Sequence, residues 1–418
     1  MSLLKRYCII VNRLKIGSEI VATFNIQKIK GIKKKVVNSN IILTARTKIT
    51  RVTIIIAVVT VVVIIAIVGI FMYRKYKSYD DYKVLSSMNI ESGSNSKYLQ
   101  YCDFVVKYSS DGISYIDSEG TVWDASYQMK SPIIDICDEY IAVADKNTND
   151  IYIYDKDGNE GKVTTSYPII KVEIAKQGVV AALLEDRNAN YIEVFDREGN
   201  KLVSHKTLLD ENGYPVDFSL SESGEKMAVS YIKVNNGAMA NKIVFYNFSK
   251  AGKNSDNRVV GTFDQYKDVI VPMVKFTSEN DVIAVGENVL SIYEMRSKVS
   301  LNEDIKIKDE IQKAFYSDEY VGFVLKNSNS RNPYRLEVYN LGGSRVMKKE
   351  IAMSYDNVSF AGKNVLMYDD MNCQIISFDG VKKYKHTFRG EINSIIPVDG
   401  SNTFLFMTNS KIQKVKLK

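Results

Sequence analysis

The chain has 418 residues, enough for one large repeat domain or two ordinary ones, and a formal net charge of +7. Residues 1–51 carry twelve Lys/Arg and one acidic residue, whereas residues 78–418 carry a net charge of −7. This acidic larger part argues against a nucleic-acid partner. The chain has only two histidines, and its four cysteines lack metal-ligand spacing, so we expect no metal site, no bound cofactor and no catalytic residues.

Residues 52–73 form an uncharged apolar stretch, VTIIIAVVTVVVIIAIVGIFMY. At about 1.5 Å per residue, a helix over this stretch is long enough to cross a bilayer. A cleaved signal peptide would need a shorter apolar region followed by small residues, but bulky and basic residues follow here. The sequence therefore predicts one membrane-spanning helix, a signal anchor, rather than a signal peptide or a buried core helix.

The basic residues around this helix predict its orientation. They are concentrated before it, and the positive-inside rule then places residues 1–51 in the cytoplasm and residues 78–418 outside. Within the tail, Lys28–Lys35 is a basic cluster, and apolar residues between Leu3 and Leu14 have helical spacing. The tail either binds lipid or a partner, or is a solvated signal that fixes the orientation.

A repeat fills the rest of the chain. Short apolar strands end in an aromatic residue followed by Asp, Asn or Glu, at Asp155, Asp196, Asn247, Glu294, Asn340 and Asp379, with a variant at Asp117. This period in an all-strand sequence predicts an all-β fold, a β-propeller with four strands per blade. Seven complete blades are expected near residues 98–130, 133–167, 169–206, 214–264, 270–306, 311–352 and 355–389.

The last segment, Glu391–Lys418, supplies only three strands. A spare strand at Tyr82–Met88 precedes the first blade, and we predict that it pairs with Lys411–Leu417 as the outer strand of the last blade. This closes the ring over residues 78–418 and makes eight blades. Seven blades remain the alternative if one blade boundary is wrong.

Asp117–Trp123 (DSEGTVW) resembles the blade consensus of quinoprotein-type, WD-repeat-like propellers, in which Asp, Gly and Trp dock neighbouring blades. The turns at Asp155–Gly158 and Asp196–Gly199 keep the Asp and Gly without the Trp. The overall layout resembles single-pass bacterial membrane proteins with a C-terminal propeller. Members of the superfamily range from dehydrogenases that use pyrroloquinoline quinone to assembly factors without chemistry, so the resemblance implies the fold and not an activity.

Other candidate sites have simpler structural interpretations. Trp123 follows an Asp-Gly turn and is expected to dock blades, and we find no acids clustered on the channel strands that could serve a quinone cofactor. His205 and His386 fall on outer strands and are expected at the surface. The Asp145–Asp150 segment lacks the Gly and Glu of a calcium loop and is interpreted as a turn. Cys102 and Cys137 occupy equivalent places in adjacent blades and are expected to be buried free thiols.

The favoured function is a non-catalytic interaction or scaffold module of the cell envelope that binds a protein or a glycan. Its candidate partner-binding residues lie in two long inserts, Lys233–Lys242 and Lys326–Pro333, between second and third strands. These residues are Asn235, Asn236, Met239, Arg331, Asn332 and the adjacent Tyr334. The alternatives are an envelope enzyme or ligand sensor with a small molecule in the propeller channel, and a transmembrane sensor whose output is the tail.

Overall fold

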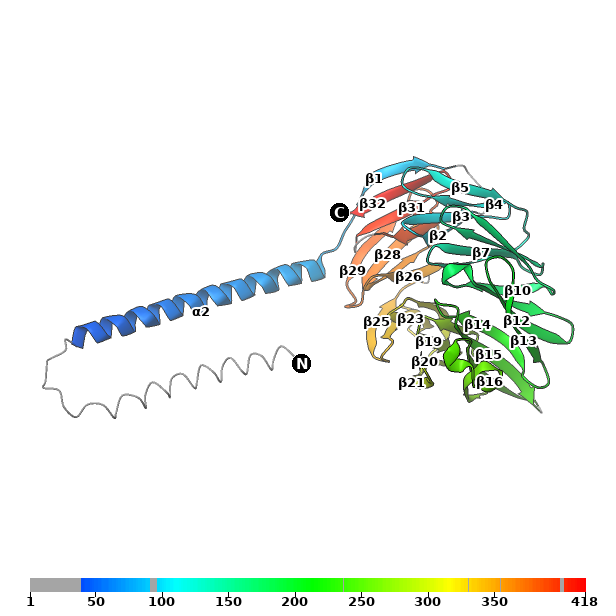
Figure 1. Cartoon of the computed structure of the whole chain (residues 1–418). Coiled ribbons are helices and arrows are strands. Elements are labelled where there is room, and N and C mark those ends of the chain that lie inside the picture. Colours follow the sequence, from blue (N-terminus) through cyan, green and yellow to red (C-terminus); the bar gives the residue numbers. More distant parts are fainter. Residues whose placement is uncertain (1–38, 91–95, 236, 330, 354, 399–401) are drawn as a thin grey trace, which may run out of the picture. The chain divides into compact units, whose positions relative to one another are not determined.

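The computed structural model describes residues 39–90, 96–235, 237–329, 331–353, 355–398 and 402–418, and it divides into two compact units, residues 1–75 and 76–418. The first unit contains all but the last residue of α2 (Ser39–Tyr76), shown in Figure 1. Within α2, Thr53–Tyr73 is long and apolar enough to cross a membrane, and its apolar side chains are exposed. The helix begins at Ser39, earlier than predicted. The predictions for Leu3–Leu14 and Lys28–Lys35 lie outside the described residues.

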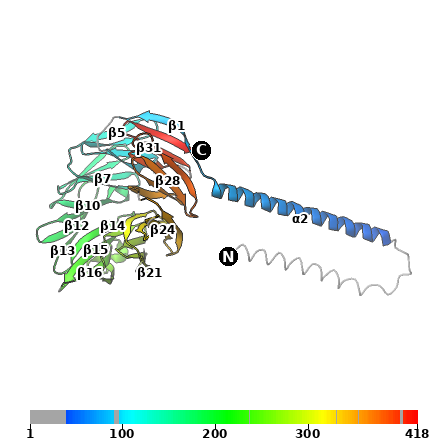
Figure 2. The ribbon, with the colours of Figure 1, turned by 180° about the vertical axis from the view of Figure 1, so that it is seen from behind.

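In the described part of residues 76–418, the strands form eight four-stranded antiparallel sheets, the blades of a propeller (Figures 1 and 2). Blade 1 comprises β2 (Lys97–Tyr101), β3 (Phe104–Tyr108), β4 (Gly112–Ile116) and β5 (Thr121–Ser126); blade 2, β6 (Pro132–Cys137), β7 (Tyr140–Asp145), β8 (Asp150–Asp155) and β9 (Glu160–Thr164); blade 3, β10 (Ile169–Ile174), β11 (Val180–Glu185), β12 (Ala189–Phe195) and β13 (Lys201–Leu208); blade 4, β14 (Tyr214–Leu220), β15 (Lys226–Asn235), β16 (Ala238–Asn247) and β17 (Val259–Lys267).

The second half of the ring repeats this arrangement. Blade 5 comprises β18 (Met273–Phe276), β19 (Asp281–Val285), β20 (Val289–Met295) and β21 (Val299–Lys306); blade 6, β22 (Ile311–Tyr316), β23 (Tyr320–Lys326), β24 (Tyr334–Asn340) and β25 (Arg345–Ile351); blade 7, β26 (Asn357–Ala361), β27 (Asn364–Tyr368), β28 (Asn372–Ser377) and β29 (Lys382–Thr387); blade 8, β30 (Ser394–Pro397), β31 (Thr403–Met407), β32 (Lys411–Leu417) and β1 (Tyr82–Asn89). Three short 3₁₀ turns are Lys176–Gly178, Lys250–Gly252 and Asp256–Arg258. Each predicted blade range coincides with one sheet to within a few residues, and the count is eight.

The repeated acidic or amide residue lies within two residues of the end of the third strand in blades 1 to 7. In blades 1 to 4 and in blade 6 its side chain accepts hydrogen bonds from amides of the turn to the fourth strand. Asp155 Oδ1 accepts hydrogen bonds from the amides of Asp157 and Asn159, at 3.0 and 2.9 Å. Asp196 and Asn340 accept equivalent bonds from the residues four positions later. An Asx cap of this kind needs only local sequence, which explains why the repeat predicts the blades well.

The hydrophobic core is divided among the blade interfaces. Eight clusters of buried apolar side chains are found among the described residues, and each joins two blades adjacent in the ring. One of them joins blade 8 to blade 1 through Leu405, Met407, Val105 and Ile116. Because each cluster joins two neighbouring blades, the apolar core is continuous around the ring. Burial of apolar surface is the main favourable term in folding, and here it stabilises the junctions between blades.

The ring is closed by strands from both ends of the propeller. β1 pairs antiparallel with β32, from Tyr82↔Leu417 to Asn89↔Lys411, with a register shift between Val84 and Ser86. Both views show β1 beside the C-terminal strand (Figures 1 and 2). This is the position that the sequence analysis assigns to the spare strand. The Tyr82 ring packs against His386 and Phe406 at centroid distances of 5.4 and 5.2 Å.

Trp123 docks blade 1 against blade 2, as the repeat consensus predicts. Its ring stacks on Tyr154 at a centroid distance of 5.4 Å, and its Nε1–H donates to the carbonyl of Lys156 at 3.1 Å. Gly158 lies against the indole: a Cβ there would be 2.8 Å from Trp123 Cγ, and the φ of Gly158 is +80°. Both observations explain why the turn requires glycine.

The expected burial of two cysteines and the expected exposure of two histidines need correction. Cys102 is exposed rather than buried, because it occupies the tight turn between β2 and β3 with a φ of +46°; Cys137 is half-buried, and both are free. His205 and His386 lie on the outer strands β13 and β29 as expected, but both are half-buried. His205 packs on blade 4, where its Nε2 lies 3.0 Å from the Tyr246 hydroxyl.

Candidate functional site in the central channel

The inner strands of the propeller each have an edge without a strand partner. β6, β10, β14, β18 and β22 stand first in their sheets and pair only with the second strand. Amides on the other edge therefore need hydrogen-bond acceptors from outside their own sheet. Polar side chains from the neighbouring blade provide them.

Acceptor side chains on β6, β10 and β14 bind amides of the next inner strand in the ring. These bonds run from Ile174 N to Asp135 Oδ2 at 2.8 Å, from Leu220 N to Glu173 Oε2 at 2.9 Å, from Val274 N to Asp217 Oδ2 at 2.8 Å and from Phe276 N to Ser219 Oγ at 3.1 Å. Blades 2 to 5 are thus linked in sequence around the channel. The carboxylates have a structural role, since they satisfy otherwise unpaired backbone donors.

The same carboxylates meet two lysines in a channel ion cluster, which we define as Asp135, Lys171, Glu173, Asp217 and Lys275. Lys171 Nζ lies 2.5 Å from Asp217 Oδ1 and 3.0 Å from Glu173 Oε1, and it donates to the Phe218 carbonyl at 2.7 Å. Lys275 Nζ lies 2.8 Å from Glu173 Oε1. Glu173 thus bridges both lysines, and Asp217 is paired with Lys171. Among the described residues, no lysine or arginine lies within ion-pair distance of Asp135.

The ionisation of these groups follows from their partners. Burial alone would raise the pKa of Glu173, but Lys275 and Lys171 hold that pKa below its ordinary value. Asp135 has no such ion pair, and burial raises its pKa to about 6 despite the more distant Lys275. Burial would lower the pKa of Lys275, but Glu173 and Asp135 raise it above its ordinary value. Burial also raises the pKa of Asp217, although its pair with Lys171 offsets part of this effect. The cluster therefore has two well-matched lysines, and Asp135 is its one carboxyl group without an ion pair.

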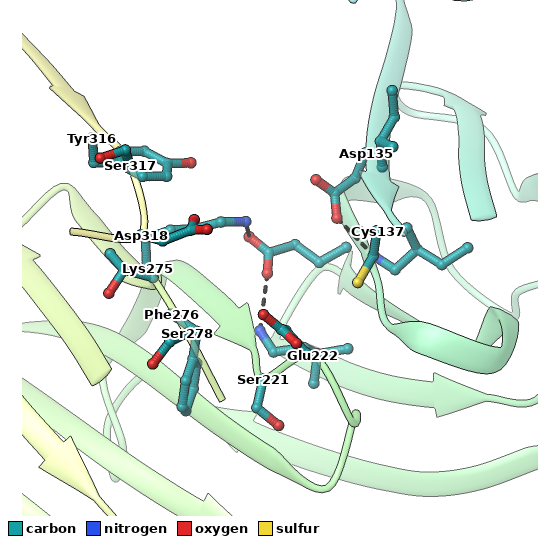
Figure 3. A pocket seen from close by; sticks show the side chains of 15 residues that line it. Asp135, Cys137, Ser221, Glu222, Lys275, Phe276, Ser278, Tyr316, Ser317 and Asp318 are labelled. Atoms are coloured by element: carbon teal, nitrogen blue, oxygen red, sulfur yellow. Dashed lines mark hydrogen bonds and ion pairs between the residues drawn. The ribbon is translucent and has the colours of Figure 1, made fainter. Parts of the chain in front are cut away.

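Two cavities of about 320 Å³ each meet at this cluster. The first cavity is lined by turn residues that follow the inner strands, including Ser221 and Asp318. The second is lined by residues near the strand starts, including Ile133 and Met273. Asp135, Glu173, Lys275 and Tyr316 line both cavities. Figure 3 shows Asp135 and Tyr316 on opposite sides of the first cavity, with the Lys275 side chain reaching between them in this view.

The expectation that no acids cluster on the channel strands is wrong. Asp135, Glu173 and Asp217 lie on the inner strands of three consecutive blades, β6, β10 and β14. The available signal was a charged residue inside short apolar inner strands, as in PIIDIC, IIKVEI and YPVDFSL. Such a residue is expensive to bury without a partner, and its partners here come from other blades. In the described residues, no group of three or more His, Cys, Asp or Glu is arranged to hold a metal ion.

The insert Lys233–Lys242 is not the loop that we expected. β15 and β16 pair through it up to Asn235↔Ala238, so that it is the end of an extended hairpin. Asn235 therefore belongs to β15 and Met239 to β16, where Met239 is half-buried and pairs with Val234. Asn236 lies outside the described residues. The overlooked signal was the Asn236-Gly237 dipeptide, a frequent two-residue hairpin turn.

The second insert does form a loop between β23 and β24. Its polar side chains are partly used within the protein: the amides of Asn329 and Asn332 both donate to Glu350 Oε2, at 3.2 and 3.3 Å. Arg331 is exposed, and Tyr334 is the first residue of β24. The two sets of predicted residues lie on blades 4 and 6, with blade 5 between them in the ring order.

The Asp145–Asp150 segment forms the turn between β7 and β8. Asp145 accepts hydrogen bonds from the amides of Lys130 and Ser131, at 3.1 and 2.7 Å, in the connection from blade 1. Asp150 binds Thr164 and Lys162 of β9. The oxygens of these carboxylates thus stabilise the turn and the blade junction.

Residues 75–417 match the model of a family described as "Family of unknown function (DUF5711)". The chain belongs to this family. The matched residues cover the propeller and the end of α2. A search of the curated proteins finds no match.

Solved structures with similar folds are propellers from distant proteins. BamB from Moraxella catarrhalis aligns with a TM-score of 0.51 at 11% identity, covering 81% of this chain and 100% of that chain. Sqt1 from Chaetomium thermophilum aligns with a TM-score of 0.51 at 8% identity, with the same two coverages of 81% and 100%. At this identity the likeness shows the fold alone.

Proposed function

We propose that this member of the family is a membrane-anchored propeller that acts as a non-catalytic protein-interaction module of the cell envelope. In this proposal Thr53–Tyr73 is the anchor and the propeller lies outside the cytoplasm. The uncharged span in α2 and the charge bias of the sequence support that placement. The propeller likeness of BamB and Sqt1 is compatible with a binding module.

The observation that carries the proposal is the extended hairpin of blade 4. β14 accompanies β15 only as far as Ile232, and β17 accompanies β16 only as far as Ala240. The described residues of the hairpin tip, 233–235 and 237–239, therefore extend beyond the ladder pairs of both flanking strands, with one further bond from the Asp268 amide to the Met239 carbonyl at 3.1 Å. Val234 in this tip is 66% exposed, and Leu209 of the preceding connection is 46% exposed. A projecting hairpin with an exposed valine and a largely unpaired strand edge is suited to a protein contact.

A shortened hairpin tests the proposal. The variant deletes Val234–Asn235 and Ala238–Met239 and keeps Asn236-Gly237, so that the turn joins Lys233 to Ala240. Those two residues are already paired, two positions from Asn235↔Ala238, and the hydrogen-bonding phase of the ladder is therefore preserved. We expect little change in the melting temperature, because the deleted residues pair with each other and lose one bond outside the hairpin, from the Asp268 amide to the Met239 carbonyl at 3.1 Å.

Contact between the hairpin and a partner protein is measured separately, by photo-crosslinking in living cells. A photoreactive amino acid at position 234 should give a defined protein adduct, and the shortened hairpin should lose that partner in co-purification. The matched control carries the photoreactive amino acid at Arg187, an exposed residue in the short turn between β11 and β12 on the same face. Equal adducts from positions 234 and 187, or none from 234, would contradict the proposal.

The channel supports a second candidate function, a sensor that binds a small molecule. One observation favours it: a cavity of about 320 Å³ is lined by Asp135, which has no matching lysine in the ion cluster. Pockets with a few convergent polar groups are the usual small-molecule sites. Thermal-shift measurements with small ligands of different charge test this function, because a channel without a site would respond to none of them.

A further inference from the structure

The channel ion cluster has more negative than positive groups. Asp135, Glu173 and Asp217 face Lys171 and Lys275, so one carboxylate exceeds the lysines when all five are ionised. Lys171 uses its three donors on Asp217, Glu173 and the Phe218 carbonyl. Glu173 is bridged by both lysines. The excess charge therefore falls on Asp135.

Asp135 is also the carboxyl group with room beside it. Its Oδ2 accepts from the Ile174 amide at 2.8 Å, and its side chain lines both channel cavities. Tyr316 of β22 lies on the opposite side of the first cavity and is 41% exposed (Figure 3). A tyrosine side chain offers a cation both an aromatic ring and a hydroxyl oxygen.

The turns around the first cavity add further negative charge. Glu222 and Asp318 line the cavity, and Asp138 lies in the turn after β6. Lys176 lies 2.9 Å from Glu222 and 3.9 Å from Asp138. A cavity lined mainly by one sign of charge raises the local concentration of ligands of the opposite sign.

We propose that the first cavity binds a small organic cation of the alkylammonium class, with its charged group between the Asp135 carboxylate and Tyr316. This inference rests on the second candidate function, ligand sensing in the channel, and names the ligand class. A compact ammonium group needs few partners and suits this site. A divalent metal ion would need several carboxylates that are here already paired with lysines.

The test uses the full chain in detergent micelles and three probes of matched size: butylamine, butanol and butyrate. Isothermal titration calorimetry at about pH 7.5 should show saturable binding of butylammonium and none of the other two. Butanol controls for partition into the cavity or the micelle, because it has the same chain without the charge. At about pH 5 butylammonium binding should weaken, since Asp135 then becomes protonated.

Asp135→Asn should weaken butylammonium binding by at least about tenfold, because the ligand loses a partly buried charge partner. The variant keeps an oxygen that can accept from Ile174, so circular dichroism should show an unchanged fold. The matched control, Asp264→Asn, makes the same chemical change at an exposed site on the outer strand β17 and should bind normally.

The outcomes separate the ligand class from the sensor function. If butanol or butyrate binds and Asp135→Asn abolishes that binding, the channel is a ligand site but the cation proposal is wrong. If none of the three probes binds, both the proposal and the sensor function are rejected. If butylammonium binds equally to wild type and Asp135→Asn, the site is not at Asp135 and the proposal is overturned.

Discussion

At the scale of single residues, Asp135 and Glu173 show how similar carboxyl groups acquire opposite properties. Both accept an amide hydrogen bond from the next inner strand, at 2.8 and 2.9 Å. Glu173 is also bridged by two lysines, whereas Asp135 has no ion pair within the channel cluster. The difference in partners predicts opposite effects on stability when each charge is removed.

Asp135→Asn should stabilise the protein at neutral pH. The pKa of Asp135 is raised to about 6 by burial, so the folded state binds this proton more tightly than the unfolded chain. The resulting stabilisation is complete below the ordinary pKa of about 4 and is lost as the pH rises through about 6. The asparagine variant, which carries no charge, should therefore melt above wild type at about pH 7.5 and like wild type near pH 4. A lower melting temperature at pH 7.5 would contradict the prediction.

Glu173→Gln should have the opposite effect and destabilise the protein at neutral pH. The lysines hold the folded-state pKa of Glu173 below its ordinary value, so its contribution is present at neutral pH and is lost as the pH falls through the folded-state pKa. The variant leaves Lys171 and Lys275 without their shared partner. We expect a loss of about 3 kcal/mol in the free energy of unfolding at pH 7.5, measured by urea denaturation.

At the scale of elements, β1 differs from the other outer strands because it comes from the opposite end of the propeller. Every fourth strand lies at the edge of its sheet, so removing β1 would only make β32 another edge strand. The cost of removal therefore comes from lost packing and lost ladder pairing with β32, rather than from the edge itself. Tyr82 contributes to that packing, because its ring contacts the rings of His386, Phe388 and Phe406.

Tyr82→Ala should destabilise the propeller by about 2 kcal/mol, since it removes a half-buried aromatic side chain. The matched control is Leu85→Ala in the same strand. Leu85 is 50% exposed and lies at the register shift, without a paired residue on β32. Its loss should change stability by less than about 0.5 kcal/mol. Equal effects of the two substitutions in urea denaturation would show that Tyr82 does not hold the closing strand.

At the scale of the whole molecule, local signals predicted the fold and missed the candidate site. Asp155 caps its turn through bonds to residues two and four positions later, so its role is visible in a short stretch of sequence. Glu173 acts on Leu220 and Lys275, which belong to other blades. Those contacts exist only once the ring is assembled, so the short sequence around Glu173 indicates a buried charge but not its partners. The hairpin at Asn235 differs from the predicted loop because an Asn-Gly dipeptide lets a long insert continue as two paired strands.

The orientation of the chain across the membrane is a property of the whole molecule. Twelve basic residues before the apolar span should hold residues 1–51 in the cytoplasm, with the propeller outside. Protease added to intact protoplasts should then digest the propeller and leave an N-terminal tag protected. The control is the same digestion after lysis, in which the tag should also be lost. If the propeller resists digestion until lysis, the predicted orientation is wrong. The partners of the propeller would then have to be cytoplasmic, and the envelope-binding proposal would be rejected.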